Sequence, residues 1–302
     1  MPLLSTDDGV KLHYEEAGSG TPIVFVHEYA GDWRSWEPQL RYFSRNYRCI
    51  TYSARGYLPS DVPKGADSYS QEHWREDVRA VIDGLKLERP HVVGLSMGAF
   101  ATLHFGMKYC TRGKPPKARS LTLAGVGSGA HPAQYKEFQK SALANAEFIR
   151  KNGMMQFAAT YGHGATRLQH QRKDPRGFAE YVKQLTEHSA EGSAGTMTGY
   201  QGRRPSLYAL TDEISRIDVP VLIMAGDEDE PCIEASAMLK RAIPQAGLAV
   251  LAQSGHGINL EEPALFNQLL GDFLQRAESG NWGTRDPRTA PASIWGPGGK
   301  PA

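Results

Sequence analysis

The pattern best suited to chemistry is Gly94-Leu95-Ser96-Met97-Gly98. It directly follows an apolar run at 91–93, and a helical pattern over 99–109 comes after it. A sharp turn from a strand into a helix needs small neighbours, and it lifts the serine hydroxyl to a helix N-terminus, where developing negative charge is favoured. We therefore predict that Ser96 is a nucleophile; a tight glycine turn without catalysis is the alternative.

A serine hydroxyl is a weak nucleophile near neutral pH, so it needs a base. Of the ten histidines, His256 lies in the loop Ser254-Gly255-His256-Gly257, just after an apolar run at 248–251. That loop is expected at the carboxyl end of the sheet, on the same side as the serine turn. This position predicts His256 as the base.

The base needs an acid to fix its tautomer and to stabilise its cation. Residues 227–230 are all carboxylates and follow the apolar run at 219–224, whereas residues 123–133 contain no Asp or Glu. We predict Asp229, which is far enough past the strand to turn back toward His256. Asp227 is the alternative.

A tetrahedral intermediate needs hydrogen-bond donors for its oxyanion. The backbone amide of Met97, directly after the nucleophile, is predicted as one donor. The loop after the run at 23–26 contains His27, Glu28 and Tyr29, and we predict the Tyr29 amide as the second donor. His27 is expected to brace this loop.

Strand and helix patterns alternate around these residues. Short runs that predict strands lie at 10–14, 23–26, 49–52, 91–94, 120–123, 219–224 and 248–251. An apolar helical face runs from Trp74 to Leu85, with Ser68 and Gln71 as a capping box, and another follows Pro263. This order predicts an α/β fold with a mostly parallel sheet.

The alternation stops over 128–212, which shows helical patterns and no convincing strand. We predict a helical cap here, inserted between core segments 1–127 and 213–278, with Pro132 and Pro175 as helix starts; ordinary surface helices are the alternative. Residues 279–302 predict an irregular Gly/Pro-rich tail, whose Trp282 and Trp295 are expected to pack on the core or on a second subunit of a homodimer.

Composition narrows the class of protein. The 302 residues are 40% hydrophobic and 22% charged, with a net charge of +1, so we expect a globular protein without nucleic-acid or membrane partners. No signal peptide or membrane span is predicted. Three dispersed cysteines predict a reducing cytoplasm, and we expect neither a metal nor a nucleotide cofactor.

Taken together, these features resemble the α/β-hydrolase superfamily, in the branch with a helical cap. The matching residues are His27 with its loop, Arg55-Gly56, the 94–98 turn, Gly226 with Asp229, and Gly255-His256 with Glu262-Pro263. The resemblance implies an eight-stranded, mostly parallel sheet flanked by helices, and a Ser–His–Asp triad. Glu28 stands where relatives often have glycine, and we expect it to point away from the oxyanion site, toward Arg55.

The resemblance implies an esterase-like serine hydrolase acting on a small to medium, partly apolar molecule. Ser96 in place of an aspartate argues against epoxide opening and halide removal. Lactone, amide or carbon–carbon bond hydrolysis with the same triad is an alternative, and a ligand receptor with slow turnover is another. For substrate binding we predict Trp33, Tyr161, His163 and Tyr200.

Overall fold

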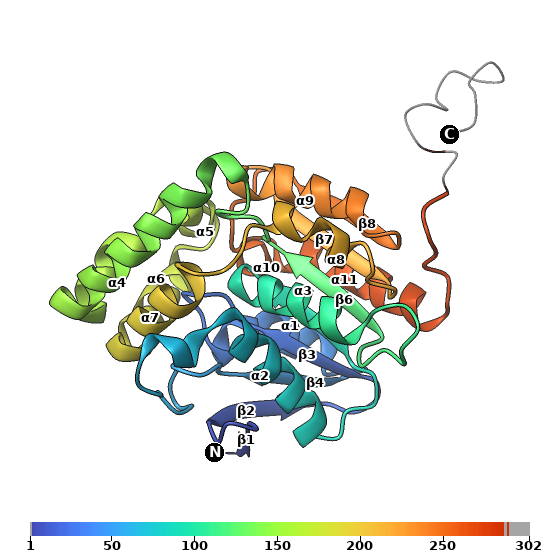
Figure 1. The fold of residues 1–302 in the computed structure, drawn as a ribbon, viewed down its shortest axis with the longest axis horizontal. Helices are drawn as coiled ribbons and strands as arrows, with labels where there is room; N and C mark the ends of the chain where they lie inside the picture. Colours follow the sequence, from blue (N-terminus) through green and yellow to red (C-terminus); the bar gives the residue numbers. More distant parts are fainter. Residues whose placement is uncertain (1, 287–288, 290–302) are drawn as a thin grey trace.

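The protein is described by a computed structural model that covers residues 2–286 and 289. An eight-stranded sheet runs through it in the order β1-β2-β4-β3-β5-β6-β7-β8 (Figure 1). The strands are β1 Leu3–Ser5, β2 Lys11–Ala17, β3 Pro22–Val26, β4 Arg48–Tyr52, β5 His91–Leu95, β6 Ser120–Ala124, β7 Val221–Gly226 and β8 Ala246–Leu251. The pairs β1–β2 and β2–β4 are antiparallel, and the pairs from β4 to β8 are parallel. The predicted mostly parallel eight-stranded sheet is confirmed.

Helices cover both faces of the sheet, and each face has its own apolar cluster. On one face α2 (Gln71–Gly84), α3 (Met97–Tyr109) and α9 (Glu230–Ala242) pack against alternate strand residues such as Val24 and Leu121. On the other face α1 (Glu37–Phe43), α10 (Ile258–Glu261) and α11 (Pro263–Glu278) pack against residues such as Phe25 and Leu95. Because the central strands are buried on both faces, they are apolar along nearly their whole length.

Local sequence signals set most helix starts. Pro132, Pro175 and Pro263 are the first residues of α4, α6 and α11, as predicted. The predicted capping box of Ser68 is wrong. Ser70 is the N-cap of α2 and its hydroxyl accepts from the His73 amide, while Ser68 lies in the short 3-10 helix Ala66–Tyr69 that precedes it.

The chain between β6 and β7 is helical. It forms α4 (Pro132–Tyr161), α5 (Leu168–Lys173), α6 (Pro175–Thr186), α7 (Ala190–Thr196), the π-helical segment η4 (Met197–Gln201) and α8 (Thr211–Ile214). Helices α4 to α7 lie together at one side of the molecule, and the arrowhead of β6 points toward them (Figure 1). These helices therefore stand at the end of the sheet where the parallel strands finish.

Glycines bring part of this helical segment very close to the core. Gly192 on α7 lies against Gly56, so a Cβ on Gly192 would collide with the Gly56 carbonyl. Gly195 lies in the same way against the Tyr69 ring, and Gly199 against the Ala66 carbonyl. Only residues without a side chain allow such close contact.

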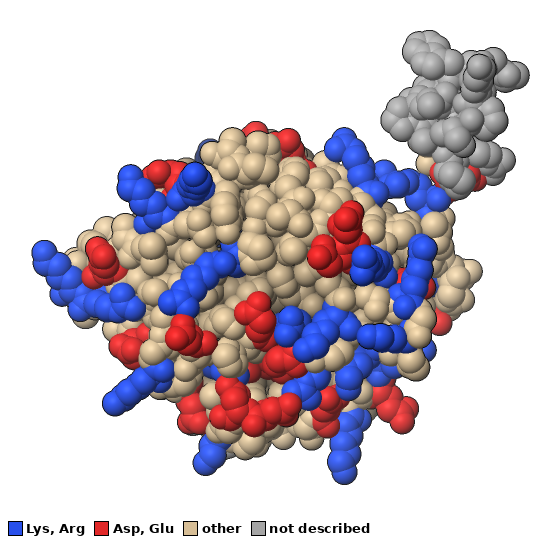
Figure 2. All heavy atoms as spheres, viewed as in Figure 1, with Lys and Arg blue, Asp and Glu red and all other residues tan. Residues whose placement is uncertain are grey.

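The beginning of the tail packs on the core. The Trp282 ring lies edge-on to Phe273 at 4.7 Å, and its indole N–H donates to the Gln245 carbonyl at 2.8 Å. This agrees with the expectation that Trp282 packs against the core, whereas Trp295 lies outside the described residues. No described helix is both long and apolar enough to cross a membrane. Acidic and basic side chains are interspersed on the face drawn in Figure 2.

Candidate active site

Ser96 occupies a strained turn between β5 and α3. Its φ of 53° is in the left-handed region, which residues other than glycine seldom adopt, and its amide donates to the Ala124 carbonyl at 2.8 Å. A Cβ on Gly94 would collide with the backbone of Gly98, and a Cβ on Gly98 would collide with the Val26 carbonyl. The glycines at these two positions therefore allow the close packing that holds this turn.

Three side chains predicted from distant parts of the sequence meet at this turn. His256 Nε2 lies 2.7 Å from Ser96 Oγ, and His256 Nδ1 lies 2.7 Å from Asp229 Oδ2. Asp229 is 2% exposed and His256 is 6% exposed, while Ser96 is only partly buried. A hydroxyl, an imidazole and a carboxylate thus form one hydrogen-bonded chain, and the Ser96 hydroxyl is its accessible end.

Neighbouring acids hold the His256 loop, a role that the sequence patterns did not indicate. The exposed Asp227, the alternative acid, accepts from the Ser254 amide at 3.0 Å. The Glu261 carboxylate accepts from the amides of Gly255 and Gly257 at 2.5 and 3.0 Å. Glu261 is the last residue of the short helix α10, and no sequence motif at this position indicates its role.

Charge coupling within the pair favours a charged His256. Burial opposes the cation, but the Asp229 carboxylate outweighs burial and raises the pKa of His256 above its ordinary value. Burial likewise opposes the anion, and the imidazole lowers the pKa of Asp229. The Asp229 carboxylate is therefore placed to stabilise the imidazolium form of His256.

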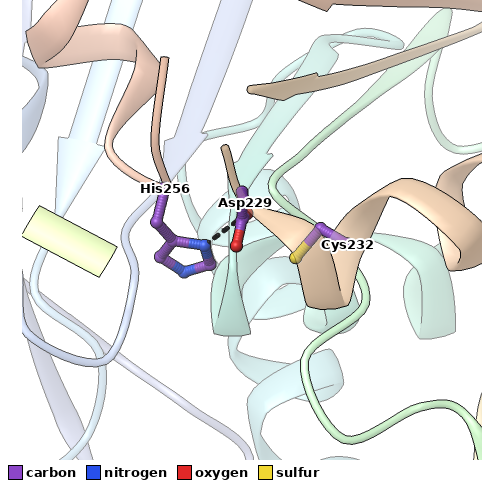
Figure 3. A group of neighbouring side chains, drawn as sticks. All are labelled: Asp229, Cys232 and His256. Carbon is purple, nitrogen blue, oxygen red and sulfur yellow. Dashed lines mark hydrogen bonds and ion pairs between the residues drawn. The ribbon is translucent and has the colours of Figure 1, made fainter. Parts of the chain in front are cut away.

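Cys232 is a further neighbour that the sequence did not single out. Its thiol, on the first turn of α9, faces the Asp229–His256 pair (Figure 3), and one ligand atom from each of the three residues lies within 4.8 Å of the others. Such a set can hold a metal ion, but the His256 nitrogen and the Asp229 oxygen are already bonded to each other. Burial raises the pKa of the Cys232 thiol, which keeps it protonated.

Comparisons with known proteins agree with this geometry. The model of the alpha/beta hydrolase fold family matches residues 21–263. The chain belongs to this family. The predicted membership of the α/β-hydrolase superfamily is thus confirmed, and the sheet order and the hydrolase relatives fit the enzyme class expected from the sequence.

Individual relatives of this α/β hydrolase are distant in sequence. The AB hydrolase superfamily protein YisY of Bacillus subtilis is 27% identical over 275 residues, 89% of this chain and 97% of that protein. The 3-oxoadipate enol-lactonase 1 of Acinetobacter baylyi is 24% identical over 253 residues, 84% of this chain and 88% of that protein. The structure of a thermophilic esterase from Thermogutta terrifontis superposes with a TM-score of 0.79 at 23% identity, covering 91% of this chain and 98% of that one.

In the described part of the chain, two backbone amides near the Ser96 turn have no acceptor: that of Met97, the first residue of α3, and that of Tyr29, in the loop after β3, which packs against Gly98. His27 braces the loop, because its Nδ1 donates to the Glu28 carbonyl at 2.7 Å and its Nε2 accepts from the Ala54 amide at 3.0 Å. Burial lowers the pKa of His27 to about 4, so the ring is neutral and can make both bonds.

The expected orientation of Glu28 toward Arg55 is wrong. Glu28 is 2% exposed and forms an ion pair with Arg167, in the segment between α4 and α5. Burial opposes the Glu28 anion, but the guanidinium lowers the pKa of that carboxyl. Arg55 instead pairs with Asp77 and Asp8. A long-range partner such as Arg167 leaves no local pattern in the sequence.

The four predicted substrate-binding side chains do not converge. Tyr161 is partly exposed, and its ring lies 5.7 Å from that of Tyr29, beside the site. Tyr200 is fully buried and its hydroxyl donates to the Met97 carbonyl at 3.0 Å, so it supports the Ser96 turn and has no surface left for a substrate. Trp33 packs on His13 at the rim of an outer hollow.

His163 is likewise misplaced for binding. It is exposed just beyond the end of α4, where its ring packs edge-on against Phe178 at 5.1 Å. The hollow that Trp33 lines also contains His170 and Tyr181, and none of the Ser96, His256 and Asp229 side chains. Aromatic composition alone could not distinguish these packing contacts from a pocket.

Proposed function

We propose that this α/β hydrolase cleaves carboxylic esters, cyclic esters included, of small to medium, partly apolar molecules through an acyl-enzyme. The observation that carries the proposal is the hydrogen-bonded chain from Ser96 through His256 to Asp229, with 2.7 Å at each step. The accessible hydroxyl and the two unpaired amides of Met97 and Tyr29 support the same reaction.

The proposed steps follow from these positions. Ser96 Oγ attacks the acyl carbon while His256 Nε2 takes up the hydroxyl proton, and Asp229 stabilises the imidazolium. The Met97 and Tyr29 amides donate to the oxyanion of the tetrahedral intermediate. His256 then protonates the leaving oxygen, and a water molecule, deprotonated by the same nitrogen, releases the acid.

We further propose that residues 128–212 act as a cap over this site, between core segments 1–127 and 213–278, with 279–302 as a tail. The ion pair between Glu28 and Arg167 supports this, because it joins the helical segment to the loop that carries the Tyr29 amide. Of the four predicted pocket residues we retain Tyr161, whose burial raises its pKa and keeps the phenol neutral.

Replacing the nucleophile tests the reaction. Ser96→Ala is expected to lower kcat/KM for p-nitrophenyl butyrate by at least ~10³-fold, because the remaining site still binds substrate but forms no acyl-enzyme. Its circular dichroism and Tm should match the wild type. The control is Ser215→Ala, an exposed serine at the end of α8. Turnover by Ser96→Ala near the wild-type rate would overturn the proposal.

Lactones, the cyclic esters, are included in the proposal because one relative is named a 3-oxoadipate enol-lactonase. Assays with γ- and δ-lactones beside linear esters of equal carbon number decide which of these two classes the protein prefers.

Several expectations remain predictions: carbon–carbon or amide bond cleavage, slow turnover as a receptor, a cytoplasmic location, and the lack of nucleic-acid and membrane partners. The absence of a disulfide among the three cysteines, all of them described, supports the predicted reducing compartment.

A further inference from the structure

Arg204 is a buried guanidinium that forms no ion pair with any described residue. It follows η4, is 4% exposed, and donates through Nη2 to the Ser128 carbonyl. Its Nε and Nη1 have no acceptor in the part of the chain that the structure describes. Burial lowers its pKa to about 10, so the side chain is still a cation at neutral pH.

The other two arginines that are buried in the described chain differ in this respect. Arg55 pairs with Asp77, and Arg167 pairs with Glu28. A buried charge without a partner is strongly unfavourable, which is why such charges are almost always compensated. The structure thus contains one deeply buried cation whose compensating anion is not supplied by the described chain.

Aromatic rings define the direction from which an anion can approach Arg204. Its guanidinium carbon lies 3.7 Å from the centre of the Phe100 ring and 4.6 Å from that of Phe138. Rings stacked on a guanidinium leave the donors at its edge available. A carboxylate can bind a guanidinium with both oxygens across Nε and Nη2 or across Nη1 and Nη2. Nη2 of Arg204 keeps a second hydrogen besides the one that it donates to Ser128, so both edges are suited to this group.

The Arg204 guanidinium lies close to Ser96, the proposed nucleophile. Phe100 is one helical turn after Ser96, to whose carbonyl its amide donates at 3.0 Å, and one turn of helix rises ~5.4 Å. On the other side, the Ser128 hydroxyl lies 3.7 Å from the thiol of Cys232, which faces Asp229 and His256. Arg204 therefore stands between the first turn of α3 and the loop after β6, within reach of a small substrate held at Ser96.

We propose that Arg204 binds a carboxylate of the substrate, so that the preferred substrates are esters or lactones that also carry a free carboxylate. The inference rests on the proposed function, because it assumes that Ser96 is the nucleophile. The contact with Arg204 then lowers KM for substrates that carry a carboxylate, while the Ser96–His256–Asp229 chain carries out the bond cleavage.

The test compares two substrates with the same leaving group: mono-p-nitrophenyl adipate, which has a free carboxylate, and its methyl ester, which does not. The wild type is expected to favour the acid in kcat/KM. Arg204→Met should reduce this preference at least 10-fold, chiefly through KM. Arg203→Met is the matched control, since Arg203 is exposed and pairs with Asp67, and it should leave the preference unchanged.

A second measurement does not depend on turnover. Ser96→Ala protein is titrated with adipate by calorimetry, and adding Arg204→Met should weaken binding at least 10-fold. Arg204→Lys keeps the positive charge but cannot bind a carboxylate with two parallel hydrogen bonds, so it should also reduce the preference for the acid. If Arg204 is only structural, Arg204→Met lowers Tm and leaves the preference of the folded protein intact, which overturns the inference. Failure of the wild type to hydrolyse either ester, or full activity of Ser96→Ala, overturns the proposed function instead.

Discussion

At the scale of single residues, Asp229 controls the charge state of His256. A neutral imidazole is needed to accept the serine proton, so activity should appear as the pH rises through the pKa of His256. Because the Asp229 carboxylate raises that pKa against the effect of burial, the acidic limb of the wild-type profile is expected above the ordinary histidine range.

Asp229→Asn tests this coupling. The carboxylate that raised the pKa is removed while burial remains, so the acidic limb of kcat/KM should move to lower pH, and the plateau should fall about 10²- to 10⁴-fold. The measurement is a pH–rate profile with p-nitrophenyl acetate. Asp272→Asn, which removes an exposed carboxylate on α11, serves as the control. An unshifted limb in Asp229→Asn would contradict the assignment.

Sequence alone predicted the positions of Ser96, His256 and Asp229 because each follows a strand, and parallel strands end at one edge of a sheet. It could not predict Glu261, Cys232 or Arg167. Those side chains lie at the site because of how the backbone runs in three dimensions, and the local sequence around them contains no pattern that indicates this course. Trp33 and Tyr200, predicted for substrate binding, instead pack on His13 and support the Ser96 turn, since burial of an aromatic ring is far more often packing than binding.

At the scale of elements, the strands and long helices were predictable from apolar periodicity. Two short features were not. β1 has only three residues, too few to show an alternation, and the start of α2 depends on which of two nearby serines accepts from the helix. The helices between β6 and β7 could be recognised as helical, but their packing on the core depends on contacts such as Gly192 with Gly56.

The ion pair of Glu28 and Arg167 is the principal charged contact between the α4–α5 segment and the loop after β3. Removing one partner leaves the other buried and uncompensated, so Arg167→Met and Glu28→Gln should each lower the free energy of unfolding by about 3–5 kcal/mol. The double variant should be more stable than Arg167→Met, because no lone charge remains. Urea unfolding measures this, with the exposed Arg172→Met as control. Losses that simply add would show that the two charges are not coupled.

At the scale of the whole molecule, the start of the tail belongs to the folded core. Trp282 covers Phe273 of α11 and donates to the Gln245 carbonyl before β8. Trp282→Ala should lower the free energy of unfolding by about 1–3 kcal/mol, less than for a fully buried tryptophan, because the ring is partly exposed. Thermal and urea unfolding test this. Unchanged stability would show that the contact is incidental.

The predicted homodimer is a separate question at this scale. Light scattering of the full chain and of Trp282→Ala decides whether a second copy binds and whether this ring takes part. A dimer that persists in Trp282→Ala would place the contact elsewhere on the surface.

The backbone contact between Gly192 and Gly56 has a practical consequence for protein engineering. A single added methyl group at Gly192, Gly195 or Gly199 would force α7 and η4 off the core, so variant libraries that randomise these positions should yield mostly misfolded proteins. Helix α4 differs in this respect: it already contains a break at Gly153, where φ is 77° and a Cβ would meet no atom within 4 Å. Directed evolution toward bulkier compounds should therefore begin on that helix.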